Sequence, residues 1–374
     1  MTSRATTALI LFFGAGGDSP VEERLDAVRI AIGTGTLRRA YAAGFTPLIA
    51  VTADAAAREA FLAAGAEVVP PVTEPFHFGR ELADLAAGRG LLRLCAIGAG
   101  AGALLRTSDL TALREELEAS EALVLSNNYY SADLIGLVPA SALAAIELPA
   151  TDNPLPRLLH QQAGLPSRQL ARSAATLLDV DTPADATVLL RHPQCPEELR
   201  AVGAWDAELG PRIDALMRII TTPERELVVA GRVGAPVWSY LETQTACRVR
   251  MLAEERGMQA AGRDVSGKAR TALGFLYAAI GPEAFFGRMA ELGDGLLLDS
   301  RVIFAHLGWR PGPADRFSSD LFAVDEISDP DVRAFTAAAA AAPIPVLLGG
   351  QTLVSGVLWT MVDAAWSGYP DPAG

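Results

Sequence analysis

The sequence predicts a mainly parallel α/β domain over residues 1–193, followed by a mainly α-helical domain over residues 194–374. In the first part, short apolar segments alternate with helical segments of about ten residues, which is typical of a parallel sheet with helices on both faces. After His192-Pro193 this alternation gives way to a series of longer helical segments. The length of 374 residues also fits two domains better than one.

Short apolar segments of the first part are expected to form strands at 8–13, 47–51, 67–69, 91–97 and 122–125. They lack polar alternation, so we expect strands that are buried on both faces. Helices are expected between them, at 37–43, 55–64, 76–87 and 109–119. Gly44 and Gly65 end the first two of these helices, because glycine commonly follows the last helical residue.

Helices dominate the prediction for the second part, at 197–220, 236–256, 266–280, 282–292 and 329–342. A last strand is expected at 345–348, and a last helix at 352–366. The segment 344–362 carries no charge and is long enough to cross a membrane. Pro345, Gly349 and Gln351 interrupt it, and its flanks are acidic rather than basic, so we expect it to be buried inside the protein.

Composition excludes several classes of protein. Half of the residues are hydrophobic and 20% are charged, so the chain can bury a large core without disulfides or metal. The 44 acidic and 31 basic residues give a net charge of −13, which argues against nucleic-acid binding. The three cysteines are odd in number and far apart, which indicates a reducing, cytoplasmic location rather than a disulfide framework.

The most specific motif is Asp179-Val-Asp-Thr-Pro-Ala-Asp185. Asp179 and Asp181 are two residues apart, so their side chains point the same way if they lie in a strand. Thr182 is expected to cap a helix that has Asp185 in its first turn. On spacing alone, an ordinary strand-to-helix turn with solvated acids is favoured.

The motif resembles the signature of nucleotidyltransferases with a Rossmann-like GT-A fold. This group includes the molybdenum-cofactor and 2-phospholactate guanylyltransferases and the methylerythritol-phosphate cytidylyltransferases. Other features occur in the same order as in that family: a glycine-rich loop at 14–17 and the segments 35–54 and 65–70. The resemblance covers residues 8–193 and does not extend into the second part.

The resemblance implies a nucleotide site and a magnesium ion. Gly14, Gly16 and Gly17 would bind a nucleoside triphosphate. Arg24 would be a catalytic residue that contacts its phosphates. Asp179 and Asp181 would hold Mg²⁺.

Two features differ from the family's pattern. The family's first loop carries a phosphate-binding lysine, whereas residues 1–193 contain no lysine. The family also places a metal-binding Asp after its fourth strand, whereas the matching segment 97–105 has no carboxylate. The metal would therefore depend on Asp179 and Asp181, with Asp133 as a further candidate, and on the substrate's own phosphates.

Two further strand ends carry candidate binding groups. Gly98 and Gly100 follow the fourth expected strand, where free N–H groups would favour an anion, or small residues would let a helix pack closely. Asn127 and Asn128 follow the fifth and could read a base or sugar edge. Asp133 is a catalytic candidate that could bind a metal or a hydroxyl. The alternative for residues 125–133 is a set of Asx turns that cap the next helix.

The resemblance thus predicts a transferase that moves a nucleotidyl group from a nucleoside triphosphate to a small phosphorylated or carboxylated acceptor. A non-catalytic protein that binds nucleotides or sugar nucleotides on the same fold is one alternative, and a GT-A glycosyltransferase is another. Residues 194–374 carry no recognised motif, so they could bind the acceptor, a partner, or a second copy of the chain in a homo-oligomer. Nucleic acid and membrane are not expected partners.

Overall fold

The computed structural model describes residues 6–368, which form two compact units. The first unit contains the chain up to Ala15, together with Arg29–Asp179 and Pro196–Glu198. The second contains Gly16–Val28, Val180–Cys195 and the chain from Leu199 onward. This division differs from the predicted boundary after residue 193, because the helix that follows Asp181 contacts elements of the second unit.

The first unit is built on a seven-stranded sheet with the order β3-β2-β1-β4-β6-β5-β7, in which β6 alone is antiparallel to its neighbours. Its strands are β1 (Thr7–Phe12), β2 (Leu48–Val51), β3 (Glu67–Val69), β4 (Arg93–Gly98), β5 (Leu123–Ser126), β6 (Leu134–Val138) and β7 (Ser167–Gln169). Its helices are α2 (Ala55–Ala63), α3 (Phe78–Gly88), α4 (Thr107–Ala119), η1 (Ala140–Ala145), α5 (Leu155–Ala163), α6 (Ala174–Leu177) and most of α1 (Pro20–Ala42).

Both faces of this sheet are buried, as the apolar strands predict. Leu9 and Leu11 of β1 lie in one hydrophobic core, whereas Ala8 and Ile10 lie in the other. The predicted strands β1 to β5 are therefore confirmed within two residues at each end. The short strands β6 and β7 were not predicted, and α1 begins well before the expected helix at 37–43.

The second unit contains a parallel sheet of which the sequence analysis predicted only the last strand, at 345–348. Its order is β11-β10-β8-β9, and its strands are β8 (Glu226–Gly231), β9 (Arg248–Ala253), β10 (Gly295–Asp299) and β11 (Val346–Gly349). The helix predicted at 236–256 is wrong in its second half, because α10 (Ala235–Gln244) ends and β9 follows. β9 is an edge strand that alternates exposed Arg248 and Arg250 with half-buried residues, which fits a strand better than a helix.

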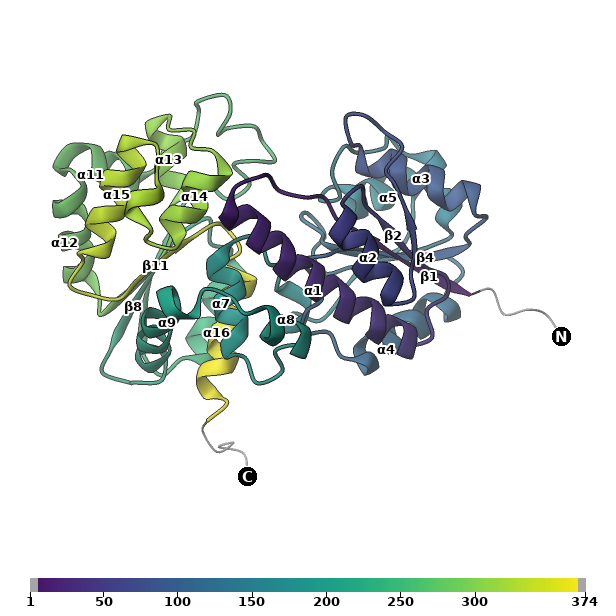
Figure 1. The fold of residues 1–374 in the computed structure, drawn as a ribbon, viewed down its shortest axis with the longest axis horizontal. Helices are drawn as coiled ribbons and strands as arrows, with labels where there is room; N and C mark the ends of the chain where they lie inside the picture. Colours follow the sequence, from purple (N-terminus) through teal and green to yellow (C-terminus); the bar gives the residue numbers. More distant parts are fainter. Residues whose placement is uncertain (1–5, 369–374) are drawn as a thin grey trace. The chain divides into compact units, whose positions relative to one another are not determined.

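Helices pack on both faces of this second sheet (Figure 1). The helices of the unit are α7 (Pro183–Arg191), most of α8 (Glu197–Val202), α9 (Asp206–Ile220), α10, α11 (Ala272–Ile280), α12 (Pro282–Leu292), α13 (Arg301–Leu307), α14 (Pro313–Asp320), η2 (Val324–Glu326), α15 (Pro330–Ala340) and α16 (Gly356–Trp366). Phe285, Phe304 and Phe335 pack against apolar residues of β8, β10 and β11 in one core. On the other face, α9 contacts the same three strands and α7 contacts β11.

The uncharged segment 344–362 forms β11 and the start of α16, and most of its residues are buried within the second unit. Across residues 6–368, no helix combines the length and apolarity that crossing a membrane would require.

The contact between α11 and α13 gives a test of packing in the second unit. A Cβ atom added at Gly274 would lie 2.7 Å from Cβ of His306, whereas one added at Gly287 of α12 would meet no atom within 4 Å. We expect Gly274→Ala to lower the free energy of unfolding by roughly 1–3 kcal/mol through overpacking. The control Gly287→Ala should raise it by up to about 1 kcal/mol, because alanine favours helix.

Urea denaturation followed by tryptophan fluorescence measures this difference, since all five tryptophans lie at or beyond Trp205 and so report on the second unit. Equal stability of the two variants would contradict the close α11–α13 contact.

Candidate functional site

A pocket of about 730 Å³ opens in the first unit, where β1, β2 and β4 end. In an open α/β sheet, ligands commonly bind at the carboxyl ends of the parallel strands. β6 runs antiparallel, so it brings the start of its strand to the same edge. The pocket is lined by Phe12, Phe13, Gly14, Ala15, Val51, Ala53, Asp54, Pro71, Phe76, Phe78, Ala96, Ile97, Gly98, Asp133, Ile135, Ala150, Thr151 and Asp152.

Aromatic rings form one wall of this pocket. Phe12 lies 4.8 Å from Phe78 and 6.3 Å from Phe76, measured between ring centroids. Phe76 is 50% exposed, which leaves its ring available to a ligand. An exposed ring at the mouth of a pocket is suited to stacking on a flat group.

The loop that carries Pro71 and Phe76 is held by Glu81, a residue that the sequence analysis did not single out. Glu81 is buried, and its Oε1 accepts hydrogen bonds from the backbone N–H groups of Val72 and Thr73 and from the Thr73 hydroxyl, at 2.8, 2.5 and 2.6 Å. A carboxylate that receives three donors fixes the loop firmly. The only sequence signal was a Glu in the first turn of α3, which is common at helix starts.

The structure brings Asn127 and Asp133, which the sequence offers as separate binding candidates, into direct contact. Asn127 is buried, and its amide accepts from the N–H groups of Asp133 and Leu134 and donates to Asp133 Oδ2 at 3.1 Å. These bonds occupy the amide, so Asn127 positions Asp133 at the pocket rather than facing a ligand. The Asn128 side chain accepts from the N–H of Tyr130, which is the predicted alternative of an Asx turn.

The polar groups of the pocket are acidic. Asp54, Asp133 and Asp152 line it, and none of its described lining residues is lysine or arginine. Gly14 and Gly98 also line the pocket, and their binding to a nucleotide stays a prediction. Gly100 is buried and is not among the lining residues, and the Gly98 N–H donates to the carbonyl of Asp133.

Gly16, Gly17 and Arg24 belong to the second unit. The Gly16 N–H donates to Asp26 Oδ2 at 2.7 Å, and a side chain at Gly17 would overlap the carboxylate of Glu22. This part of the loop therefore lies against two acids. Arg24 donates to the carbonyl of Ala204 at 2.8 Å, and its guanidinium lies 4.8 Å from the centroid of the Trp205 ring. Their binding to phosphate stays a prediction.

The predicted metal ligands fall in different units. Asp179, in the first unit, forms an isolated antiparallel bridge with Ala101 of the loop that follows β4. It therefore lies beside the segment from which the family's metal-binding Asp is missing. Asp181, in the second unit, is exposed.

The predicted helix cap at Thr182 is confirmed, since its side chain accepts from the N–H of Asp185. Asp185 is fully buried, and its Oδ2 accepts from the N–H groups of Asp181 and Thr182 and from the Thr352 hydroxyl. Burial, followed by the charge of Asp181, raises the pKa of the Asp185 carboxyl to about 7.

Hard oxygen ligands of the kind that Mg²⁺ prefers are present, but sparsely. No group of three or more His, Cys, Asp or Glu side chains with the spacing of a metal site occurs within residues 6–368. Magnesium often binds through one or two carboxylates together with substrate phosphates, and such a site fits the residues present.

Comparison with known proteins gives structural similarities only. No known family profile matches the sequence, and no curated protein matches it. Similar solved structures include a protein described as a nucleotide-diphospho-sugar transferase from Desulfovibrio desulfuricans G20, with 17% identity over 57% of this chain and 96% of that chain and a TM-score of 0.39.

Two others are nucleotidyltransferases. A CMP:2-keto-3-deoxy-manno-octonic acid synthetase complexed with CTP is 14% identical over 48% of this chain and 94% of that chain, with a TM-score of 0.35. A cytidylyltransferase from Leptospira borgpetersenii serovar Hardjo-bovis (strain JB197) is 14% identical over 50% of this chain and 85% of that chain, with a TM-score of 0.37. These similarities cover about half of the chain.

Proposed function

We propose that the first unit binds the nucleoside part of a nucleoside triphosphate, and that the protein transfers a nucleotidyl group to a small phosphorylated or carboxylated acceptor. The observation that carries this proposal is the pocket at the carboxyl edge of the first sheet, which combines aromatic rings with carboxylates. Pockets of a few hundred cubic ångströms, mostly apolar and with a few polar groups, are typical of small-molecule sites.

The lining of the pocket indicates which part of the nucleotide it takes. Bases stack on aromatic side chains, and Phe12, Phe76 and Phe78 offer such a surface. A triphosphate is strongly anionic and would be repelled by Asp54, Asp133 and Asp152. The base and ribose therefore occupy the pocket in this proposal, and the phosphates extend out of it.

Magnesium would bring the phosphates and the acids together. Asp179 and Asp133, both of the first unit, are the proposed ligands. When bound, the ion neutralises charge on the phosphates as pyrophosphate leaves. Asn127 supports this role by holding the Asp133 carboxylate in one orientation.

Nucleotide binding without catalysis is the second candidate. It is favoured by the lack of a cationic side chain in the pocket lining and by the contacts that already occupy Arg24. Pyrophosphate release separates the two candidates, because a binding protein takes up the nucleotide and releases none.

Phe76 provides the test of binding. We expect Phe76→Ala to weaken the affinity for the preferred nucleotide by roughly 1–3 kcal/mol, or about 5- to 150-fold, through loss of stacking. Calorimetric titrations with ATP, GTP, CTP and UTP, each with Mg²⁺, measure this change. The control Val72→Ala removes a 73% exposed side chain of the same loop that does not line the pocket, and should bind as the wild type does. Equal affinities of the two variants would place the base elsewhere.

Asp133 provides the test of catalysis. We expect Asp133→Asn to slow magnesium-dependent pyrophosphate release at least 100-fold, roughly 3 kcal/mol, because an amide is a weaker magnesium ligand than the carboxylate proposed for that role at the pocket. The assay uses the preferred nucleotide and a panel of small phosphorylated and carboxylated acceptors. Asp84→Asn, on the exposed side of α3, is the matched control. Release at the wild-type rate in Asp133→Asn would exclude this carboxylate from the reaction.

A further inference from the structure

The sheet of the second unit has a topological switch point. From β8 the chain crosses to β9 on one side, and it then returns to place β10 on the other side of β8. The loops that leave the carboxyl ends of β8 and β10 therefore run in opposite directions. Ligands of open α/β sheets bind in the crevice between such loops. The ends of β8 and β10 are therefore the place in this unit where a ligand is expected.

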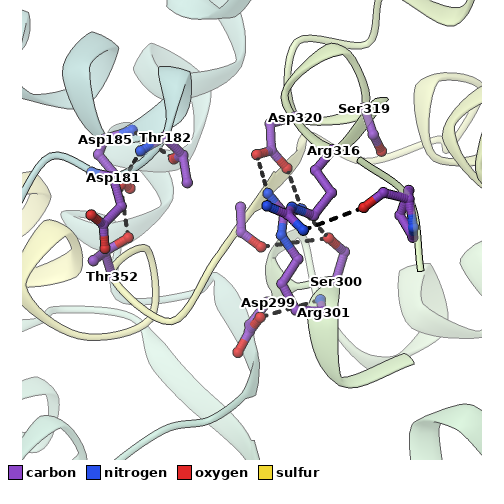
Figure 2. Close-up of polar contacts among 12 residues, drawn as sticks. Asp181, Thr182, Asp185, Asp299, Ser300, Arg301, Arg316, Ser319, Asp320 and Thr352 are labelled. Carbon is purple, nitrogen blue, oxygen red and sulfur yellow. Dashed lines mark hydrogen bonds and ion pairs between the residues drawn. The ribbon is translucent and has the colours of Figure 1, made fainter. Parts of the chain in front are cut away.

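Two buried ion pairs lie at this point (Figure 2). Arg232, which follows β8, donates to both oxygens of Asp299 at 2.6 and 3.0 Å, and the two side chains are 3% and 0% exposed. Arg301 donates to both oxygens of Asp320 at 2.8 and 2.5 Å. Buried ion pairs contribute little to stability, because desolvation offsets their attraction. Two of them at a switch point are better explained by the ligand that they orient.

Arg316 of α14 adds a guanidinium that the protein itself leaves mostly unused. Figure 2 shows it beside Arg301 and Asp320. Its one hydrogen bond within the described structure runs from Nη1 to the carbonyl of Pro311, at 3.3 Å. Burial, and then the charge of Arg301, lower the pKa of the Arg316 guanidinium, while Asp320 and Glu22 oppose this effect. Two guanidinium groups held together favour an anion that bonds to both.

Asp185, which Figure 2 shows beside Thr182 and above Thr352, supplies a buried acceptor in the same unit. Its Oδ2 receives three hydrogen bonds, but its Oδ1 is buried and has no hydrogen-bond partner within the described structure. Leaving a buried acceptor unsatisfied is costly, so such an atom calls for an explanation. Burial lowers the pKa of Arg301, but Asp320, Asp299 and Asp185 raise it more, so the Asp185 charge is felt at that guanidinium.

We propose that Arg316, Arg301 and Asp185 bind a small molecule that carries an anionic group, phosphate or carboxylate, and at least one hydroxyl. The Arg316 and Arg301 guanidinium groups bind the anion. Asp320 holds Arg301 in place, and Asp299 holds the neighbouring Arg232. Asp185 Oδ1 accepts a hydrogen bond from the hydroxyl of the ligand. All of these residues belong to the second unit, so the site does not depend on the nucleotide pocket.

Calorimetric titration of the full chain tests this site with four probes: inorganic phosphate, glycerol 3-phosphate, glycerate and glycerol. We expect saturable binding of glycerol 3-phosphate or glycerate, weaker binding of phosphate, and none of glycerol. Arg316→Gln should weaken binding of the hydroxylated anion at least about tenfold, since a charge-assisted bond is lost. Arg218→Gln, an exposed arginine of α9, and Phe76→Ala at the nucleotide pocket should both bind as the wild type does.

Asp185→Asn separates the two halves of the proposed site. It should leave the affinity for inorganic phosphate unchanged and remove the preference for the hydroxylated anion. Tryptophan fluorescence and circular dichroism verify that each variant is folded. The proposal is overturned if no anion binds with a Kd below about 10 mM, which corresponds to a binding free energy of about −3 kcal/mol. It is also overturned if Arg316→Gln binds the hydroxylated anion as tightly as Arg218→Gln does.

Discussion

A parallel sheet covered on both faces confines polar chemistry to the ends of its strands. In both units the interiors of the central strands are apolar, because helices or loops cover each side. The charged side chains of the pocket and of the buried ion pair at β8 and β10 lie at or close to strand ends: Asp133 and Asp54 at the first sheet, and Arg232 and Asp299 at the second. Both proposed sites follow from this constraint.

The sequence predicts the central strands of the first sheet well, because residues 8–13 and 48–51 are short apolar runs, the first followed by Gly14 and the second preceded by Pro47. It fails for β8, β9 and β10 of the second sheet for a physical reason. Runs as short as Leu227–Ala230 and Leu296–Leu298 suit a buried strand or a buried helix equally. In β9, arginine alternates with apolar residues, which indicates a strand. Because β9 follows soon after α10, the sequence analysis extended the predicted helix through it.

The candidate site was predictable where its parts lie close in the sequence. Asn127 and Asp133 are six residues apart, and the structure joins them. The bond between Thr352 and Asp185 spans 167 residues, and no local pattern indicates it. Glu81 was missed for a related reason, since its partners lie in a loop whose course depends on the whole first unit. The roles of Gly16 and Arg24 were also ambiguous. A glycine or an arginine at these positions suits a phosphate contact or a contact within the protein equally, and the structure shows contacts within the protein.

The central claim is that the pocket of the first unit holds the nucleoside part of a nucleoside triphosphate. A crystal structure of the protein soaked with a nucleoside triphosphate and magnesium tests it most directly. The account predicts a base stacked against Phe76, with ribose near Asp133 and the phosphates outside the lining residues. An ordered nucleotide bound elsewhere, with the pocket filled only by water, would contradict it.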